Sequence, residues 1–584
     1  MDYYHLMSSF NRLPLLIALI CALGAHAQVP DKKTVAPVSS ALDGELFYQL
    51  LLGELNAREG EPGAAYSLIL DAARKTADPR LYQRSVDIAL QARSGDSALI
   101  AARAWRLAVP ASKEANRYVL QILIGLNRLS EVVEPLKREI TNVDVKDRAA
   151  EILGLPRYFA RASDKKAAVV ALELALNDYL STPGLAASAW TVIGRSRLEA
   201  GDGVGALEAA SKAQVSDIKS EHPALLAISL MSPKTPQAEA IVKKYLEGKP
   251  LPAVRMDYAR ALIENQRLAE AGAQLQAVTT EKSDYAEAWL IKGALELQDG
   301  RLALSENSLK RYVELAIPKK TGTTRAEANR GLVQAYSSLA QIAEQRKDYV
   351  EADNWLKRID APGEQLNAQL RRAALLARQG KLEEARKLIK SQPEKTLEEA
   401  RLKLNAEIGL LRDSKKYKQA YILLSEAVKR NPSDYDFVYD LAMVAEKLGN
   451  LEEMERLLRS VIALKPDYHH AYNALGYSLA ERKLRLPESK QLILKALEFA
   501  PGDPFISDSL GWVEFRSGNM YEALRILQEA FKAKPDAEIA AHLGEVLWTL
   551  GQHEQALSTF KEGVQINPEN ETLLETIKRL RVKL

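Results

Sequence analysis

Small and apolar residues recur along most of this chain at the spacing that places them on one face of an α-helix. Near the C-terminus they occupy positions i, i+4 and i+7, as in Ala523, Leu527 and Ala530. About twelve residues earlier in each period stands a large residue followed by a small one, as in Leu510-Gly511, which indicates a partner helix that approaches its neighbour closely. A glycine, here Gly518, then allows the chain to leave the first helix. The pattern predicts a unit of helix, turn and helix.

This unit returns with a nearly constant period. Prolines that would end the second helix recur at steps of 34, 35, 34 and 33 residues, at Pro432, Pro466, Pro501, Pro535 and Pro568. Self-similarity at this period predicts a solenoid, in which each unit packs mainly on its neighbours and no single large core is needed. The apolar groups can be followed upstream to Ala65, so most of the chain is predicted to be repeat.

The C-terminal units resemble the tetratricopeptide (TPR) repeat. The resemblance rests on Asn473-Ala-Leu-Gly-Tyr477, Leu510-Gly-Trp512 and Leu543-Gly-Glu545, each followed by its apolar group and its proline. It implies an all-α fold, a TPR α-solenoid built as a right-handed superhelix of about 14–15 antiparallel helix pairs.

The repeats are less regular in the N-terminal half. Pro156 stands where the small residue is expected, and Pro233 and Pro236 shorten the first helix of another unit. The sequence predicts this organisation: a signal peptide at 1–27, a flexible leader at 28–41, degenerate N-terminal TPR-like repeats at 42–250, central TPR repeats at 251–430 with a loop insertion near 318–325, well-formed C-terminal repeats at 431–568, and a capping helix at 569–584.

The N-terminus carries the features of a secretory signal. An apolar run at 13–23 is too short to span a bilayer, follows Arg12 and precedes Ala25-His-Ala27. We therefore expect export of the chain and cleavage after Ala27. Initiation at Met1 and initiation at Met7 both stay open.

The single cysteine, Cys21, lies inside the apolar run of the signal. A lipoprotein signal normally has a small residue before the cysteine, whereas this chain has the bulky Ile20. The sequence favours removal of Cys21 with the signal. Membrane attachment would therefore require a lipid anchor at Cys21 that the preceding residue disfavours.

Charge and motifs argue against several functional classes. Lys and Arg total 80 against 77 Asp and Glu, and the signs alternate along the helices, which does not favour a nucleic-acid-binding stripe. The histidines lack metal-ligand spacing, and neither a G-x-x-x-x-G-K-[ST] loop nor a G-x-S-x-G elbow occurs. We expect no catalytic residue, no metal and no cofactor, and therefore a non-catalytic protein.

Aromatic residues concentrate at one set of positions in the C-terminal repeats. The TPR resemblance implies that the first helix of each repeat lines a concave groove, and aromatic side chains with polar groups are typical of binding hot spots. The alternative is that some of them, Trp512 and Trp548 especially, pack against the next repeat. The candidate protein-binding residues are Tyr439, Met443, His470, Asn473, Tyr477, Phe505, Trp512, Phe515 and Trp548.

The chain combines a signal peptide, a degenerate N-terminal half and regular C-terminal repeats. In this order of elements it resembles the envelope TPR proteins of Gram-negative bacteria, and among these the outer-membrane TPR adaptor that partners a carboxy-terminal processing protease. The likeness rests on Asp508-Ser-Leu-Gly-Trp-Val-Glu-Phe515 and Ala540-Ala-His-Leu-Gly-Glu-Val-Leu-Trp548. It implies a scaffold or adaptor in the periplasm or on the periplasmic face of the outer membrane, whose partners are a protease and its substrates. Two other classes stay open: a structural component of an envelope export or polysaccharide machine, and an enzyme whose site the sequence does not reveal.

Overall fold

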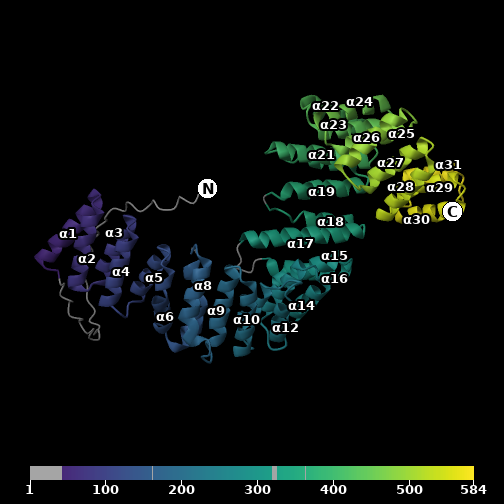
Figure 1. The fold of residues 1–584 in the computed structure, drawn as a ribbon. Coiled ribbons are helices and arrows are strands. Elements are labelled where there is room, and N and C mark those ends of the chain that lie inside the picture. The colour runs from purple at the N-terminus through teal and green to yellow at the C-terminus, as the bar shows by residue number, and fades with distance from the viewer. Residues whose placement is uncertain (1–41, 161, 318–324, 362) are drawn as a thin grey trace, which may run out of the picture. The chain divides into compact units, whose positions relative to one another are not determined.

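The computed structural model describes residues 42–160, 162–317, 325–361 and 363–584 (Figure 1). In these ranges the chain forms 31 α-helices and four short 3-10 helices, with no strand. The signal peptide, the leader and most of the loop expected near 318–325 lie outside the described residues. Internal contacts divide the chain into two units, Met1–Val254 and Arg255–Leu584.

The N-terminal unit is a row of short helices whose largest hydrophobic core runs from Leu70 to Ala209 and includes the buried side chains of Trp105 and Phe159. Smaller separate clusters lie around Ile69 and around Tyr245. Its elements are α1 (Gly44–Glu59), α2 (Pro62–Thr76), α3 (Pro79–Gln91), α4 (Gly95–Ala108), α5 (Lys113–Gly125), η1 (Leu129–Glu131), α6 (Val133–Thr141), η2 (Val145–Asp147), α7 (Arg148–Gly154), η3 (Leu155–Phe159), α8 (Lys165–Leu176), η4 (Asn177–Tyr179), α9 (Ala186–Glu199), α10 (Gly203–Ser216), α11 (Glu221–Ile228) and α12 (Pro236–Leu246).

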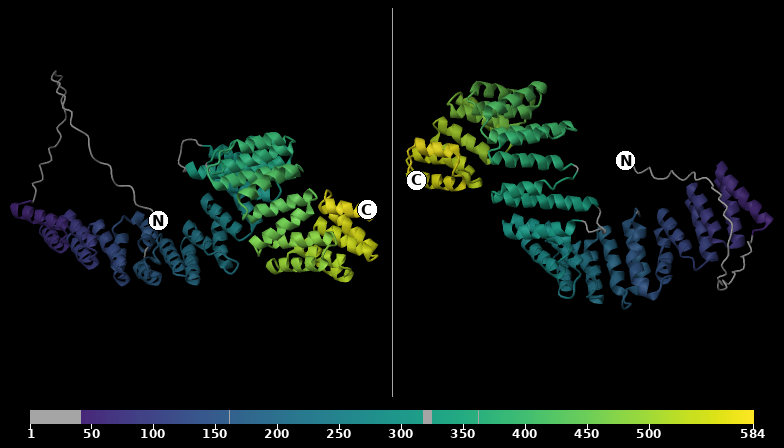
Figure 2. Two further views of the ribbon diagram at one scale, coloured as in Figure 1. Left: turned by 90° about the horizontal axis from the view of Figure 1, so that it is seen from above. Right: turned by 180° about the vertical axis from the view of Figure 1, so that it is seen from behind.

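The C-terminal unit begins within α13, and its helices appear from two further directions in Figure 2. Its apolar residues are buried in smaller clusters between neighbouring helices. Its elements are α13 (Pro252–Glu264), α14 (Leu268–Glu281), α15 (Ala286–Gln298), α16 (Leu302–Ala316), α17 (Arg325–Gln345), α18 (Tyr349–Leu356), α19 (Gln365–Arg378), α20 (Leu382–Lys390), α21 (Leu397–Asp413), α22 (Tyr417–Arg430), α23 (Tyr435–Lys447), α24 (Leu451–Leu464), α25 (His469–Glu481), α26 (Leu486–Phe499), α27 (Pro504–Arg516), α28 (Met520–Ala533), α29 (Ala537–Thr549), α30 (His553–Ile566) and α31 (Glu571–Arg579).

The helices pair as the sequence pattern predicts. Neighbouring helices along the chain pack against each other in most repeats, as α1 does with α2 and α29 with α30, whereas α7 packs mainly on α9. The predicted all-α TPR solenoid is therefore confirmed. The last helix packs on α29 and α30 and buries Leu573, as expected of a cap, whereas Leu574 on the same helix faces solvent. None of the described helices combines the length and apolar character needed to cross a bilayer.

Local signals place the helix ends. Asp503 caps α27 by accepting hydrogen bonds from the backbone N–H groups of Phe505 and Ile506 at 2.8 and 3.0 Å, and Pro504 follows at the first helical position. At the other end of this helix Gly518 has a φ of 89°, a left-handed conformation that glycine adopts without steric cost. Cap, proline and glycine together fix the length of the first helix of this repeat.

The irregular N-terminal units have short helices at their prolines. Pro156 lies in η3 directly after α7, which has only seven residues, because a proline removes the N–H that a continuing α-helix needs. The first helix of a later unit, α11, has eight residues and ends before Pro233. Pro236 opens the second helix of that unit, α12, at a position where the missing N–H costs nothing.

The C-terminal unit curls back on itself between α21 and α31. The Nζ of Lys415, in the turn after α21, lies 2.7 Å from Oε1 of Glu571 at the start of α31, although 156 residues separate them. The odd-numbered helices from α25 to α31 contact each other in succession. We call α23, α25, α27 and α29 the inner helices, because side chains from them meet inside this curl, as described below.

Gly544→Ala is expected to lower the free energy of local unfolding at α29 and α30 by about 1 to 3 kcal/mol, because a Cβ at this position would lie 2.3 Å from Cε1 of Phe560. Hydrogen exchange of the full chain measures the effect. The matched control is Gly409→Ala on α21, where a Cβ meets nothing within 4 Å. Since each repeat contacts mainly its neighbours, faster exchange spread evenly over α1–α31 would contradict the solenoid.

Candidate protein-interaction surface

All nine candidate residues lie on the inner helices, one repeat after another. Tyr439 and Met443 lie on α23, and His470, Asn473 and Tyr477 lie on α25. The remaining candidates are Phe505, Trp512 and Phe515 on α27, and Trp548 on α29. The structure joins some of them in two clusters and leaves others apart.

The first cluster is aromatic and joins α23 to the start of α25. Tyr468 lies at its centre, with ring centroids 5.4 Å from Tyr439, 5.4 Å from Tyr435 and 5.5 Å from His470. Burial, with the nearby charges of acidic neighbours, raises the pKa of Tyr439 to about 12. The imidazole of His470 is exposed and lies at the outer edge of the cluster. This arrangement offers aromatic faces and one accessible histidine to a bound segment.

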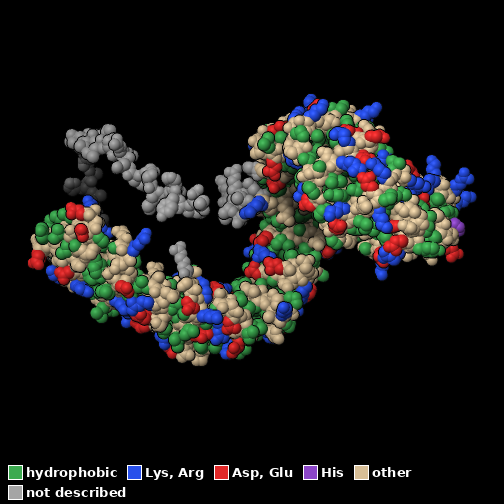
Figure 3. All heavy atoms as spheres, turned by 45° about the horizontal axis from the view of Figure 1, so that its top comes forward, with side chains coloured by type: hydrophobic (Ala, Val, Ile, Leu, Met, Phe, Trp, Pro, Cys, Tyr) green, Lys and Arg blue, Asp and Glu red, His purple; other side chains and the backbone are tan. Residues whose placement is uncertain are grey.

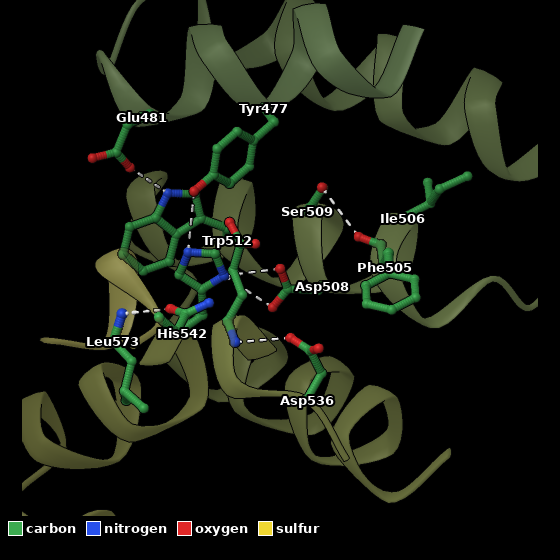
Figure 4. Close-up of polar contacts among 12 residues, drawn as sticks. Tyr477, Glu481, Phe505, Ile506, Asp508, Ser509, Trp512, Asp536, His542 and Leu573 are labelled. Carbon is green, nitrogen blue, oxygen red and sulfur yellow. Dashed lines mark hydrogen bonds and ion pairs between the residues drawn. The ribbon is translucent and has the colours of Figure 1, made fainter. Parts of the chain in front are cut away.

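The second cluster is a buried polar network across three inner helices (Figure 4). Nδ1 of His542 on α29 lies 2.9 Å from both carboxylate oxygens of Asp508 on α27. Nε2 of the same ring lies 3.2 Å from the hydroxyl of Tyr477 on α25. Nε1 of Trp512 donates to Oε2 of Glu481 at 2.7 Å. Tyr477 of α25 therefore contacts a side chain of α29, two inner helices further along the chain.

The acidic neighbours of His542 favour its protonated form. Burial alone would lower the pKa of His542, but the adjacent Asp508 carboxylate, with Glu538 and Glu481 nearby, raises the pKa above its ordinary value. Nδ1 of His542 donates to the Asp508 carboxylate, and Nε2 shares a hydrogen bond with the hydroxyl of Tyr477. Burial, reinforced by acidic neighbours, raises the pKa of Tyr477 as well, so its hydroxyl stays neutral.

Trp512 is enclosed by this network. Its side chain is 2% exposed, and its ring stacks on His542 with centroids 4.2 Å apart. The guanidinium of Arg516 lies over the same ring at 4.4 Å, and Phe515 packs beside it at 5.2 Å. Both Arg516 and Trp512 donate to Glu481, and these hydrogen bonds outweigh the effect of burial, so the pKa of Glu481 is lowered. This environment favours the packing interpretation for Trp512.

The other candidates lie outside the two clusters. Met443 is half-buried against the apolar core between α22 and α25. Asn473 is half-buried, and its Oδ1 has no hydrogen-bond partner. Trp548 packs on the core near α31, with its ring 4.2 Å from that of His553. Phe505 is 48% exposed and is the most accessible apolar side chain among the nine.

Sequence reasoning missed Tyr468, Glu481, Asp508 and His542, which the structure places at the centres of these clusters. A usable signal existed for one pair. Asp508 and His542 are 34 residues apart, so the repeat period puts an acidic and a basic side chain at the same position of neighbouring inner helices. Across the described ranges, no group of three or more His, Cys, Asp and Glu residues could hold a metal ion.

Comparison with known proteins identifies the repeat. Family models of the tetratricopeptide repeat match residues 256–318, 411–476 and 509–571. These segments are tetratricopeptide repeats, which confirms the resemblance in the C-terminal unit. Trp512 and His542 of the second cluster lie in the segment 509–571, whereas Tyr477, Glu481 and Asp508 lie between that segment and 411–476.

Two curated relatives align with parts of this chain. TPR repeat-containing protein PA4667 of Pseudomonas aeruginosa is 39% identical over 212 residues, which is 36% of this chain and 36% of that protein. Human protein O-mannosyl-transferase TMTC1 is 26% identical over 173 residues, covering 28% of this chain and 19% of the relative. The chain thus spans about a third or less of the length of these relatives. A solved tetratricopeptide repeat protein from Parabacteroides merdae, 17% identical, covers 43% of this chain and 99% of its own, with a TM-score of 0.35.

Proposed function

We propose that this chain is a non-catalytic scaffold of the cell envelope that holds segments of partner proteins on its inner helices α23–α29, and that it presents bound proteins to a carboxy-terminal processing protease. The observation that carries the proposal is the accessible aromatic edge of these helices. Phe505 and His470 are exposed on inner helices, and the ring of half-buried Tyr439 lies 6.4 Å from that of His470. Aromatic groups on a rigid frame bind partners at low entropic cost.

The periplasmic part of the proposal rests on the sequence. The apolar run at 13–23 followed by Ala25-His-Ala27 supports export and cleavage, so that the mature chain would begin at Gln28 without a lipid. Intact-mass measurement of the protein from the envelope fraction tests this. A chain that begins at Cys21 with acyl mass added would replace the soluble scaffold with a membrane-anchored one.

Affinity purification of the tagged full-length protein from envelope extract tests the scaffold itself. We expect the partners to include a processing protease, and their recovery to fall about tenfold or more with Phe505→Ala combined with His470→Ala, since hot-spot losses of 2 kcal/mol or more have this effect. The matched control is Tyr521→Ala on the outer helix α28, an aromatic side chain that is 78% exposed. If the wild type, the double variant and the Tyr521→Ala control recover the same amount of partner, helices α23–α29 do not form the binding surface.

A further inference from the structure

The first described helix, α1, is apolar on two opposite sides. One side packs on α2, where Gln49 is buried and donates to the backbone oxygen of Leu68 at 2.9 Å. A Cβ at Gly53 would lie 2.7 Å from Cδ1 of Ile69, so the two helices approach each other closely. A helix that is apolar all round is normally buried all round, and the other side of α1 is therefore expected to have a partner too.

That other side is exposed. Phe47, Leu51 and Leu55 follow at steps of four residues, which places them on one side of the helix, and Tyr48 lies next to them. The four side chains, which we call the α1 face, are 55%, 46%, 43% and 65% exposed, in that order. Over the part of the surface drawn in Figure 3, apolar side chains are interspersed with charged ones. Four large apolar side chains exposed together are typical of an interaction surface.

The last helix, α31, provides a contrast at the other end of the described chain. It buries Leu573, and Leu574 is the one large apolar side chain on this helix that is exposed. Glu575 and Lys578 are exposed with it. A terminal unit with a polar outer side keeps a solenoid soluble. Since α1 lacks such a side, its face suits contact with a further helix better than contact with water.

The charges of α1 argue against a lipid surface as the occupant. Helices that lie on membranes carry lysine and arginine along their polar side. On α1, Arg58 is the only basic residue, and the acidic residues are Glu45, Glu54 and Glu59. Oε2 of Glu54 already lies 2.7 Å from a guanidinium nitrogen of Arg84. The face therefore fits a protein helix.

The α1 face matches a second copy of itself in an antiparallel arrangement. With Leu51 on a two-fold axis, Phe47 of one copy lies against Leu55 of the other. Gly44 and Arg58 are each seven residues, about two turns, from Leu51, so they share its side of the helix and also face each other.

The two ends of the helix are complementary in space and in charge. A Cβ at Gly44 would meet nothing within 4 Å, which leaves room there for the long side chain of Arg58 from the other copy. Asp43 and Glu45 flank Gly44 and are opposite in charge to Arg58. Glu59 follows Arg58 but is turned about 100° further round the helix, away from this contact.

We propose that two copies of this chain associate through the α1 face, with the two helices antiparallel and Leu51 on the two-fold axis. Each copy supplies the helix that the other lacks at this end of its solenoid. The inference is independent of the proposed scaffold function, because α1 lies in the N-terminal unit and the inner helices lie in the C-terminal unit.

Sedimentation velocity of the chain from Gln28 onward, which contains every described residue, tests the association. We expect a dimer for the wild type and a monomer for Phe47→Glu combined with Leu51→Glu. Charges placed in the apolar contact should weaken self-association about a hundredfold or more. The matched control is Ile100→Glu combined with Leu107→Glu on α4, whose side chains are 54% and 83% exposed, and it should stay a dimer. Circular dichroism checks that both variants fold.

Cysteine cross-linking tests the antiparallel register. The only cysteine of the chain, Cys21, precedes Gln28, so an introduced cysteine has no competitor. With diamide as the oxidant, Leu51→Cys should form a covalent dimer, because the two-fold axis brings this position next to its own copy. Arg58→Cys alone should not, since its two copies would lie about 21 Å apart along the helices. Arg58→Cys mixed with Gly44→Cys should cross-link.

Three results would overturn the proposal: a monomeric wild type, a dimer that persists with Phe47→Glu and Leu51→Glu, and cross-linking of Arg58→Cys with itself. If the wild type is a monomer, hydrogen exchange of α1 identifies a different occupant. Faster exchange after deletion of residues 28–41 would assign the α1 face to that segment, and unchanged exchange would assign it to another protein.

Discussion

Asp508→Ala is expected to lower the free energy of local unfolding around α27 and α29 by about 3–5 kcal/mol. The substitution leaves His542, which is 1% exposed, without the carboxylate that balances its charge. Hydrogen exchange of the full-length protein at pH 6 measures the effect on α25–α30, and the N-terminal unit should not change. The matched control is Asp436→Ala on α23, whose side chain is 49% exposed and whose ion pair with Arg401 should contribute about 1 kcal/mol or less.

The same pair gives the stability of this region a defined pH dependence. The pKa of His542 is raised in the folded state above the ordinary value of 6.5. Its contribution to stability is therefore complete below about pH 6.5 and is lost as the pH rises through the folded-state pKa. The difference between wild type and Asp508→Ala should be largest near pH 6 and shrink toward alkaline pH. A difference that stayed constant from pH 6 to pH 9 would show that Asp508 acts by packing and not through the charge of His542.

The repeat architecture was predictable because it follows from local rules that recur. Three signals act within one helix pair, and each is visible in the sequence. They are the small residue at Gly511 or Gly544, the glycine at Gly518, and the proline that ends each unit. Once one unit is recognised, the same helix pair is expected at every further period of the sequence. The fold class and the approximate number of helix pairs could therefore be predicted.

The candidate surface was predictable only in part, because its geometry depends on how sharply the repeats curl. The sequence places Tyr477 and Trp512 on inner helices, but it does not show that Tyr477 reaches α29 or that Trp512 becomes enclosed by His542 and Arg516. Such contacts join residues up to 65 positions apart. They arise from small rotations between successive repeats, which no short motif encodes.

Trp512→Ala is expected to destabilise the C-terminal repeats by about 3–5 kcal/mol, because it removes a large buried side chain and leaves a cavity between α25 and α29. Trp512→Phe keeps most of the ring contact with His542 but removes the donor to Glu481. Its expected cost is smaller, about 1–3 kcal/mol, for the lost hydrogen bond to a charged group. Chemical denaturation followed by circular dichroism, with hydrogen exchange to locate the change, measures both variants.

This prediction separates the packing of Trp512 from the binding of partners. If Trp512 serves chiefly to hold α25, α27 and α29 together, loss of partner recovery with Trp512→Ala should follow the loss of stability, and the less destabilising Trp512→Phe should lose less of both. Phe505→Ala removes an exposed ring, so it should reduce partner recovery while leaving the denaturation curve unchanged. A stable Trp512→Ala variant that binds no partner would instead make Trp512 a direct contact, and would require the inner helices to open on binding so that this buried ring becomes accessible.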